Sequence, residues 1–145
     1  MPLRRRKLLK RKKSTPNKRK APLKRLWVKK LDEAWSTSIR GRDRKCVRCG
    51  SVNHLQAAHI FSRRRRTTRW ELLNGIALCY ACHIYWAHRE PIDFNDFIKA
   101  RLGEVDFDML KQMANRIDAP LTLERYQDTL STLQSSSENY EEVKR

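Results

Sequence analysis

Residues 46–91 read CVRCGSVNHLQAAHIFSRRRRTTRWELLNGIALCYACHIYWAHREP, and this stretch decides the fold. It holds all four cysteines of the 145-residue chain, arranged as two CxxC motifs. Gly50 follows the first motif and permits the tight turn that directs two thiolates at one ion. Two CxxC motifs a few tens of residues apart are typical of a tetrahedral zinc site. The predicted zinc ligands are Cys46, Cys49, Cys79 and Cys82.

The predicted zinc is structural, because four thiolates leave no open coordination position for a substrate. The segment is too short to bury much apolar surface, and a metal site supplies folding free energy that so small a core lacks. Four free thiols are an alternative that the spacing disfavours. A redox CxxC is another, but no thioredoxin-like βαβ pattern surrounds either motif. Cysteines that serve as metal ligands also predict a reducing, cytoplasmic compartment.

The positive charge of the chain is concentrated in two segments. The formal net charge is +17, and residues 1–30 contain 15 lysines and arginines and no acidic residue, while residues 40–69 contain 10 against Asp43 alone. Such segregation predicts a polyanionic partner, most simply DNA, with RNA as a weaker alternative. A membrane surface is disfavoured, because the basic segment lacks an apolar face and no apolar run approaches the roughly 20 residues that span a bilayer. No hydrophobic segment of a secretory signal follows the basic N-terminus.

The chain divides into five predicted segments in an α+β fold. These are a disordered basic tail (1–22), an amphipathic helix (23–41), a zinc-binding core (42–92), a helical extension (93–134) and a frayed C-terminal tail (135–145). The stripe that contains Trp27 and Trp35 recurs at helical spacing and is predicted to pack onto the core, with base stacking as the alternative. In the extension, Gly103 is a predicted helix C-cap.

Within the core, short elements alternate with turns. Residues 55–60 are predicted to form a short strand that ends near His59. Asn74-Gly75 predicts a turn, and a helix is predicted to begin near Cys79 and to end before Pro91. The basic loop of residues 63–69 separates the strand from these later elements.

Two histidines and an asparagine are the candidate catalytic residues. His59 lies at the strand end, His83 on the following helix, and Asn74 on the connection between them. A strand, loop and helix that bring two histidines face to face can hold a phosphate, one imidazole acting as general base on a water while the other helps to hold a divalent metal. Asn74 could tie the loop down and orient the base. Each histidine alone could instead be a packed or capping residue. His88 is either a second ligand of the catalytic metal or simply exposed.

A cluster of arginines lies between the predicted base and the predicted metal ligand. Arginines bind phosphate bidentately, and several together give affinity for DNA without sequence information. The alternative is a solvated run of charge. The predicted DNA-binding residues are Arg63, Arg64, Arg65, Arg66 and Arg69.

These motifs carry a resemblance to a known family. The pattern Cys46-x-x-Cys49, Ala58-His59-Ile60, Asn74 and Cys79-x-x-Cys82-His83 resembles the HNH (ββα-metal) endonucleases that contain a four-cysteine zinc site. The resemblance implies a zinc-stapled treble-clef/ββα core, a general base at His59, an orienting Asn74 and a catalytic Mg²⁺ or Mn²⁺ at His83. The basic N-terminus, the tryptophan-bearing helix and Arg42-Asp43-Arg44 before the first motif are similar to the NinG/Rap-type phage recombination nucleases.

The resulting hypothesis is a phage-encoded, metal-dependent DNA endonuclease of recombination, acting on branched DNA in the bacterial host cytoplasm. A homodimer would suit a junction substrate. Ala58 departs from the family pattern, because many HNH motifs place an aspartate or histidine just before the base as a metal ligand. One alternative is therefore a non-catalytic zinc-finger DNA-binding protein. The other is a general HNH nuclease of homing or packaging type.

Overall fold

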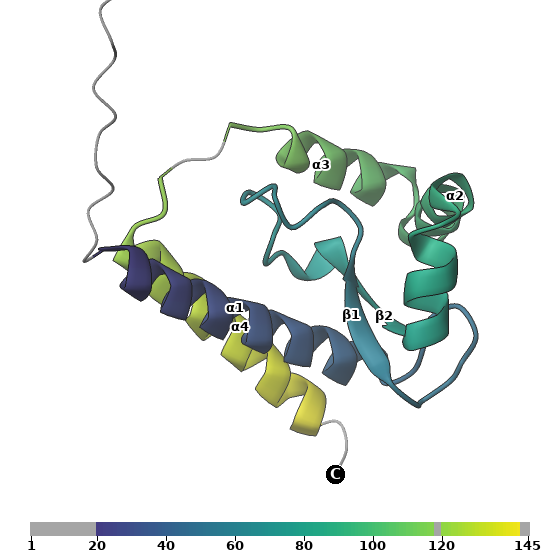
Figure 1. Ribbon diagram of the computed structural model, residues 1–145, viewed down its shortest axis with the longest axis horizontal. Coiled ribbons are helices and arrows are strands. Elements are labelled where there is room, and N and C mark those ends of the chain that lie inside the picture. Colours follow the sequence, from purple (N-terminus) through teal and green to yellow (C-terminus); the bar gives the residue numbers. More distant parts are fainter. Residues whose placement is uncertain (1–19, 118–119, 143–145) are drawn as a thin grey trace, which may run out of the picture.

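The computed structural model describes residues 20–117 and 120–142, so most of the predicted basic tail, residues 1–19, lies outside it. The fold is α+β, as predicted (Figure 1). Among the described residues, no helix is long and apolar enough to span a membrane. The elements, in chain order, are α1 (Lys20–Asp43), β1 (Leu55–His59), the single 3₁₀ turn η1 (Leu72–Asn74), β2 (Gly75–Cys79), the π-helix η2 (Cys82–Ala87), α2 (Pro91–Leu102), α3 (Glu104–Ala114) and α4 (Leu123–Glu142).

A two-stranded antiparallel hairpin lies between two helical layers. β1 and β2 pair in register from Leu55 opposite Cys79 to His59 opposite Gly75. Successive side chains of a strand point to opposite faces. Ala77 accordingly packs against α1 and α4, whereas Ile76 packs against η2 and α2. Figure 1 shows the hairpin between the α1–α4 pair and α2.

The layer on one face consists of α1 and α4 lying side by side (Figure 1). The predicted stripe of α1 is the reason that it packs there: Leu31, Trp35 and Ile39 recur every fourth residue and are at most 2% exposed. Between the helices, the buried Ser38 hydroxyl lies 3.1 Å from the Leu133 carbonyl oxygen of α4 and donates to it. The predicted core role of the tryptophan-bearing stripe is therefore confirmed for these residues of α1.

Two charged side chains at the end of α1 make hydrogen bonds to β2 and to the turn before it. The Arg42 guanidinium donates to the carbonyl oxygens of Leu72 (2.9 Å) and Gly75 (2.8 Å). The Asp43 carboxylate accepts the Ala77 backbone N–H at 2.7 Å. The Gly75 and Ala77 groups lie on β2, where a two-stranded sheet leaves backbone groups unpaired, and their bonds fix α1 against this strand.

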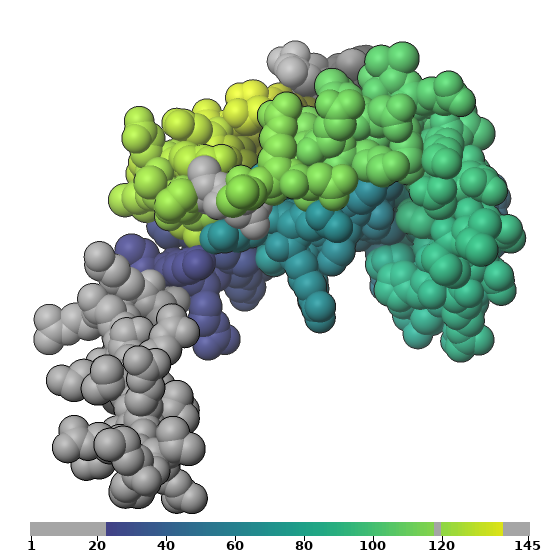
Figure 2. Space-filling view, turned by 90° about the horizontal axis from the view of Figure 1, so that it is seen from above, coloured from purple at the N-terminus to yellow at the C-terminus, as the bar shows by residue number. Residues whose placement is uncertain are grey.

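The other layer is formed by η2, α2 and α3. Pro91 is the first residue of α2, where its missing N–H costs no helical hydrogen bond. Gly103, at φ +80°, ends α2 and lets α3 begin directly after it. In the space-filling view, α3 (green) lies between α4 (yellow-green) and α2 (blue-green), over the segment around residue 60 (Figure 2).

Several boundaries differ from the sequence-based expectations. α1 begins at Lys20, three residues before the predicted start, because Pro22 falls in its first turn, where proline is tolerated. It also continues to Asp43, and α4 continues to Glu142 through a segment predicted to be frayed. Asn74-Gly75 does not form a reverse turn: Gly75 is extended (φ −136°) and begins β2. The division of the chain into five functional segments stays a prediction.

Candidate active site

The four cysteines converge at one end of the hairpin. Two come from the turn before β1, one ends β2 and one begins η2. Their sulfur atoms all lie within 4.8 Å of one another, and those of Cys49 and Cys79 are 3.7 Å apart. Tetrahedral zinc with Zn–S bonds of about 2.3 Å separates its sulfurs by about 3.8 Å. The donor set and its spacing therefore fit a structural zinc ion.

The backbone of the first CxxC turn is shaped for this purpose. Gly50 takes φ +77°, a conformation that favours glycine, and its N–H donates to the Cys46 carbonyl oxygen at 2.8 Å. The Cys46 N–H in turn donates to the Ser51 carbonyl oxygen at 2.7 Å. These bonds close the turn that brings the Cys46 and Cys49 thiols together with those of Cys79 and Cys82.

The pKa values of Cys46 and Cys82 are shifted in opposite directions. Burial raises the pKa of Cys46, but nearby backbone N–H groups outweigh burial and bring that pKa down to about 6. Burial raises the pKa of Cys82 to about 12, and the neighbouring thiols contribute in the same direction. Four thiols this close together cannot all ionise to thiolates without a cation between them. Arg48, whose guanidinium lies 3.9 Å from the Cys82 sulfur, adds one positive charge beside the site.

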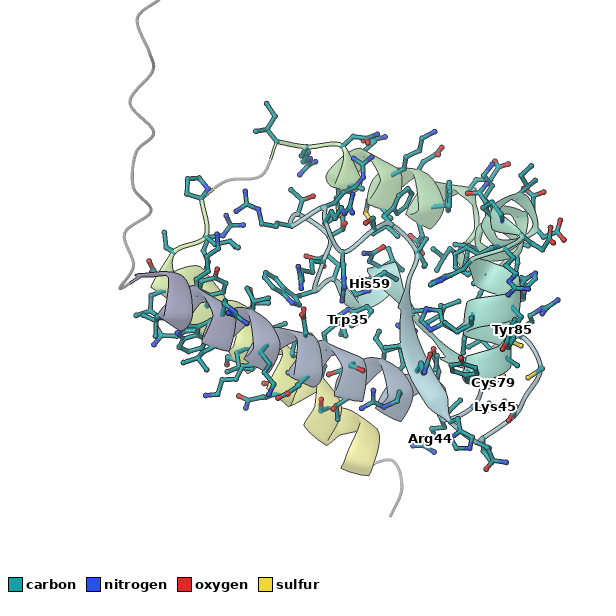
Figure 3. The ribbon with its side chains drawn as sticks, in the orientation of Figure 1. Trp35, Arg44, Lys45, His59, Cys79 and Tyr85 are labelled. Atoms are coloured by element: carbon teal, nitrogen blue, oxygen red, sulfur yellow. The ribbon has the colours of Figure 1, made fainter. Side chains whose placement is uncertain are left out.

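His59 lies at the opposite end of the hairpin from the cysteine cluster (Figure 3). Its ring stacks on Trp35 of α1, with centroids 3.9 Å apart and planes 14° apart. Its Nε2 lies 2.9 Å from the Arg69 carbonyl oxygen. A carbonyl can only accept, so Nε2 carries the proton and Nδ1 keeps a lone pair. Burial lowers the pKa of His59, so the ring is neutral at neutral pH and can act as a base.

Asn74 ties down the loop that follows β1. The side chain is completely buried and makes three hydrogen bonds. It accepts the Phe61 N–H at 2.7 Å and donates to the carbonyl oxygens of Phe61 (3.0 Å) and Thr68 (2.8 Å). These are bonds to the backbone and not to His59. Because Thr68 precedes Arg69, Asn74 fixes the segment whose carbonyl orients His59, and its influence on the base is indirect.

His83, in the π-helix η2, and His88, the residue directly after that helix, come together. In an α-helix, residues five apart are about 1.4 turns apart and point in different directions. The i→i+5 pattern of a π-helix brings such residues one above the other. The rings of His83 and His88 are accordingly in contact, with centroids 4.7 Å apart and planes at 76°. His83 Nδ1 lies 2.7 Å from Gln56 Oε1 of β1.

The three histidines line one cavity of about 580 Å³ between α1 and the hairpin. A second cavity of about 350 Å³, on the side of α2 and α3, is lined by the same three histidines. Burial also lowers the pKa of His83, helped by the neighbouring His88. Two imidazole nitrogens, with water and a phosphate completing the shell, fit a divalent cation. Within residues 20–117 and 120–142, the cysteine cluster is the one group of three or more metal-binding side chains close enough to share an ion.

The five predicted DNA-binding arginines have different environments. Arg63 lines the larger cavity and is exposed, and Arg64 is exposed. Arg65 donates to the Ala114 carbonyl oxygen at 2.8 Å and so connects the loop to the end of α3. Arg69 binds Asp32 of α1 through two hydrogen bonds of 2.9 and 2.7 Å. Arg65 and Arg69 thus have structural partners, and Arg66 is half-buried with a partner of its own.

Three further residues shape the site, and no sequence pattern indicated their role. Trp35 supports the ring of His59, although its spacing indicated only a core position. Gln56 contacts His83, and it is an ordinary residue of a short strand. Asp32 binds both Arg69 and the Trp70 indole N–H, at 2.9 Å. Burial raises the pKa of Asp32, but these hydrogen bonds outweigh burial and leave it lowered.

Comparison with known proteins adds a family assignment for the central segment. Residues 46–90 match the family model described as HNH endonuclease. This range contains the four cysteines and all three histidines of the cavity. No curated protein and no solved structure matches the chain.

Proposed function

We propose that this protein is a divalent-metal-dependent endonuclease that hydrolyses phosphodiester bonds of DNA. The observation that carries the proposal is the cavity that His59, His83 and His88 line together. The HNH endonuclease domain at residues 46–90 supports a nuclease, and the excess of positive charge suits DNA.

In this proposal His59 is the general base. Its Nδ1 accepts a proton from a water molecule as that water attacks the scissile phosphorus. The Arg69 carbonyl and the Trp35 ring hold the imidazole in one orientation throughout. Asn74 keeps the loop closed, so that the carbonyl stays in place. Arg63 would contact a phosphate oxygen from the edge of the cavity.

His83 and His88 would hold the catalytic cation, either Mg²⁺ or Mn²⁺. When bound, such an ion stabilises the charge that develops on the phosphorane and on the leaving 3′-oxygen. Products with a 5′-phosphate and a 3′-hydroxyl are the expectation from the family. The four cysteines would hold zinc for stability alone, far from the reacting phosphate.

We further propose that the substrates are branched recombination intermediates and that the protein is phage-encoded. The flanking similarity to NinG/Rap-type nucleases supports both statements. A homodimer would place two active sites at one junction. The five loop arginines remain the proposed phosphate contacts, and Arg63 and Arg64 are exposed.

The experiment is a cleavage assay on labelled linear, nicked and four-way-junction DNA, with Mg²⁺ or Mn²⁺ against chelator. The wild-type protein is expected to cut in the presence of the metal, and His59→Ala is expected to bind DNA without cutting it. Preference for junctions would support the recombination role, whereas preference for linear DNA would favour a homing or packaging nuclease.

A non-catalytic DNA-binding protein is the rival. Ala58 favours it, because a buried methyl group stands where many HNH motifs supply a metal ligand. Tight binding without metal-dependent cleavage, unchanged by His59→Ala, would establish this alternative and overturn the proposed activity.

A further inference from the structure

The Gln56 side chain contacts one of the cavity histidines. It projects from the second residue of β1, is half-buried, and lies with its Oε1 2.7 Å from His83 Nδ1. An amide oxygen can only accept a hydrogen bond, so Nδ1 carries the proton of this neutral ring. The lone pair of His83 is then on Nε2, the nitrogen that Gln56 does not engage.

The two proposed active-site rings are therefore held in opposite tautomers. His59 donates from Nε2 to the Arg69 carbonyl and keeps its lone pair on Nδ1. His83 donates from Nδ1 to Gln56 and keeps its lone pair on Nε2. Each tautomer is set by an oxygen acceptor, one on the backbone of the loop and one on a side chain of the sheet.

We infer that Gln56 is a positioning residue that fixes His83 in the Nδ1–H tautomer and thereby presents Nε2 to the cavity as a metal-binding nitrogen. This inference rests on the proposed function, in which His83 holds the catalytic cation. Metal-binding histidines characteristically donate their other ring N–H to an oxygen acceptor, and loss of that acceptor typically costs about 10–100-fold in metal affinity.

The placement of Gln56 suits this role. Its neighbours in the strand pair with β2 in register, with Gln56 opposite Leu78, so the backbone that carries the amide is rigid. The period of two along the strand puts Gln56 and Ala58 on the face toward η2, where His83 lies.

Two substitutions separate positioning from packing. Gln56→Met keeps the length of the side chain and removes the acceptor. Gln56→Glu keeps an acceptor at the same position and is the conservative rescue. If Gln56 only filled space, Gln56→Met would leave the tautomer and the metal affinity of His83 unchanged.

The test is long-range ¹H–¹⁵N NMR of the full zinc-loaded chain without added divalent cation, at a pH well above the ordinary histidine value of about 6.5. The wild type is expected to show His83 as Nδ1–H and His59 as Nε2–H. In Gln56→Met, His83 should move toward the Nε2–H tautomer while His59 is unchanged, which also reports an intact fold. Gln56→Glu should retain the wild-type pattern. Because the wild-type spectrum is itself decisive, His83 found as Nε2–H in it would overturn the inference even if a variant failed to fold.

A Mn²⁺ titration of the same samples supplies the second readout. Paramagnetic broadening at His83 is expected in the wild type and in Gln56→Glu, and Gln56→Met should need about 10–100-fold more Mn²⁺. Equal affinity in all three proteins would overturn the positioning role. Absence of broadening at His83 in the wild type would overturn Nε2 as a metal ligand. Failure of DNA cleavage with intact Mn²⁺ binding would instead count against the proposed function alone.

Discussion

At the scale of single residues, His59 is constrained from three directions. The Trp35 ring covers one face, the Arg69 carbonyl takes Nε2, and burial disfavours the charged imidazolium. The charged groups around His59 shift its pKa in both directions. Arg69 and Arg63 lower the pKa of His59 through their charge, and Asp32 raises it. The net result is a lowered pKa, which favours the neutral imidazole that the proposed general base requires.

The proposed cleavage should therefore have a characteristic dependence on pH. The folded-state pKa of His59 lies below the ordinary value of about 6.5, so activity should be level above pH 6.5 and decline only at a lower pH, as the base becomes protonated. The measurement is kcat/KM for DNA cleavage against pH. The same shift predicts a loss of stability: an imidazole that is easier to protonate in the unfolded chain destabilises the fold as the pH falls below 6.5. An activity profile with its midpoint at or above 6.5 would contradict the assignment of His59 as a buried neutral base.

Asn74 gives a second prediction at this scale. Asn74→Asp keeps the oxygen that accepts from Phe61 but removes both donated hydrogen bonds and places a carboxylate in a fully buried position. Leaving buried partners unpaired costs about 1–3 kcal/mol each, and burying a charge adds to that cost. We expect a lower Tm in thermal denaturation and a loss of DNA cleavage. Asn53→Asp, at an exposed position of the turn before β1, is the control and should change neither. A stable Asn74→Asp protein with full activity would show that the loop does not depend on this amide.

At the scale of secondary structure, η2 explains how two histidines five residues apart meet. The sequence predicted a helix here, and it placed His83 in it correctly. It did not predict the π-helical geometry, because π-helices are rare and the residue spacing does not distinguish i→i+4 from i→i+5 bonding. The same limit applies to Gly75. The Asn74-Gly75 dipeptide indicated a turn. In the structure, the absence of a side chain at Gly75 instead lets Trp35 and Ile39 of α1 pack closely against β2.

Gly75 permits α1 to lie close against β2. A Cβ built at this position would overlap the Trp35 ring and lie 2.7 Å from Ile39 Cδ1. Gly75→Ala should therefore displace the Trp35 ring, on which His59 stacks. We expect a destabilisation of about 1–3 kcal/mol, as is usual for an overpacked core, together with reduced cleavage.

Gly41→Ala in α1 is the matched control for that substitution. A Cβ there has no atom within 4 Å, so alanine should stabilise the helix by about 0.5–1 kcal/mol. Urea denaturation of both variants measures the two effects. Equal stability of the two proteins would mean that α1 can move away from the sheet without loss, and that its contact with His59 is not tightly held.

At the scale of the whole molecule, β2 joins two hydrophobic clusters into one structure. Leu78 belongs to the cluster around the cysteines, η2 and α2, and Ala77, the residue before it, belongs to the cluster of α1 and α4. The cysteine spacing predicted the metal site within the first cluster, and the α1 stripe predicted part of the second. Their connection could not be predicted from the sequence, because it depends on the pairing of β1 with β2 and on the contacts of Arg42 and Asp43 with that strand.

This connection determines what should happen when zinc is removed. A structural zinc contributes an apparent free energy of about 10–16 kcal/mol in small zinc domains, which is comparable with the total stability of about 5–15 kcal/mol of an ordinary domain. Because β2 carries both clusters, loss of zinc should unfold α1 and α4 along with the cysteine end of the hairpin. We expect the helical circular dichroism signal and zinc release to follow a single coincident transition during titration with a chelator. Cys49→Ser should give the same unfolded state, whereas Val52→Ala, at an exposed position of the same turn, should behave as the wild type. A helical signal that persists after zinc release would mean that α1 and α4 form an independent folding unit. The helices would then not need the hairpin in order to fold.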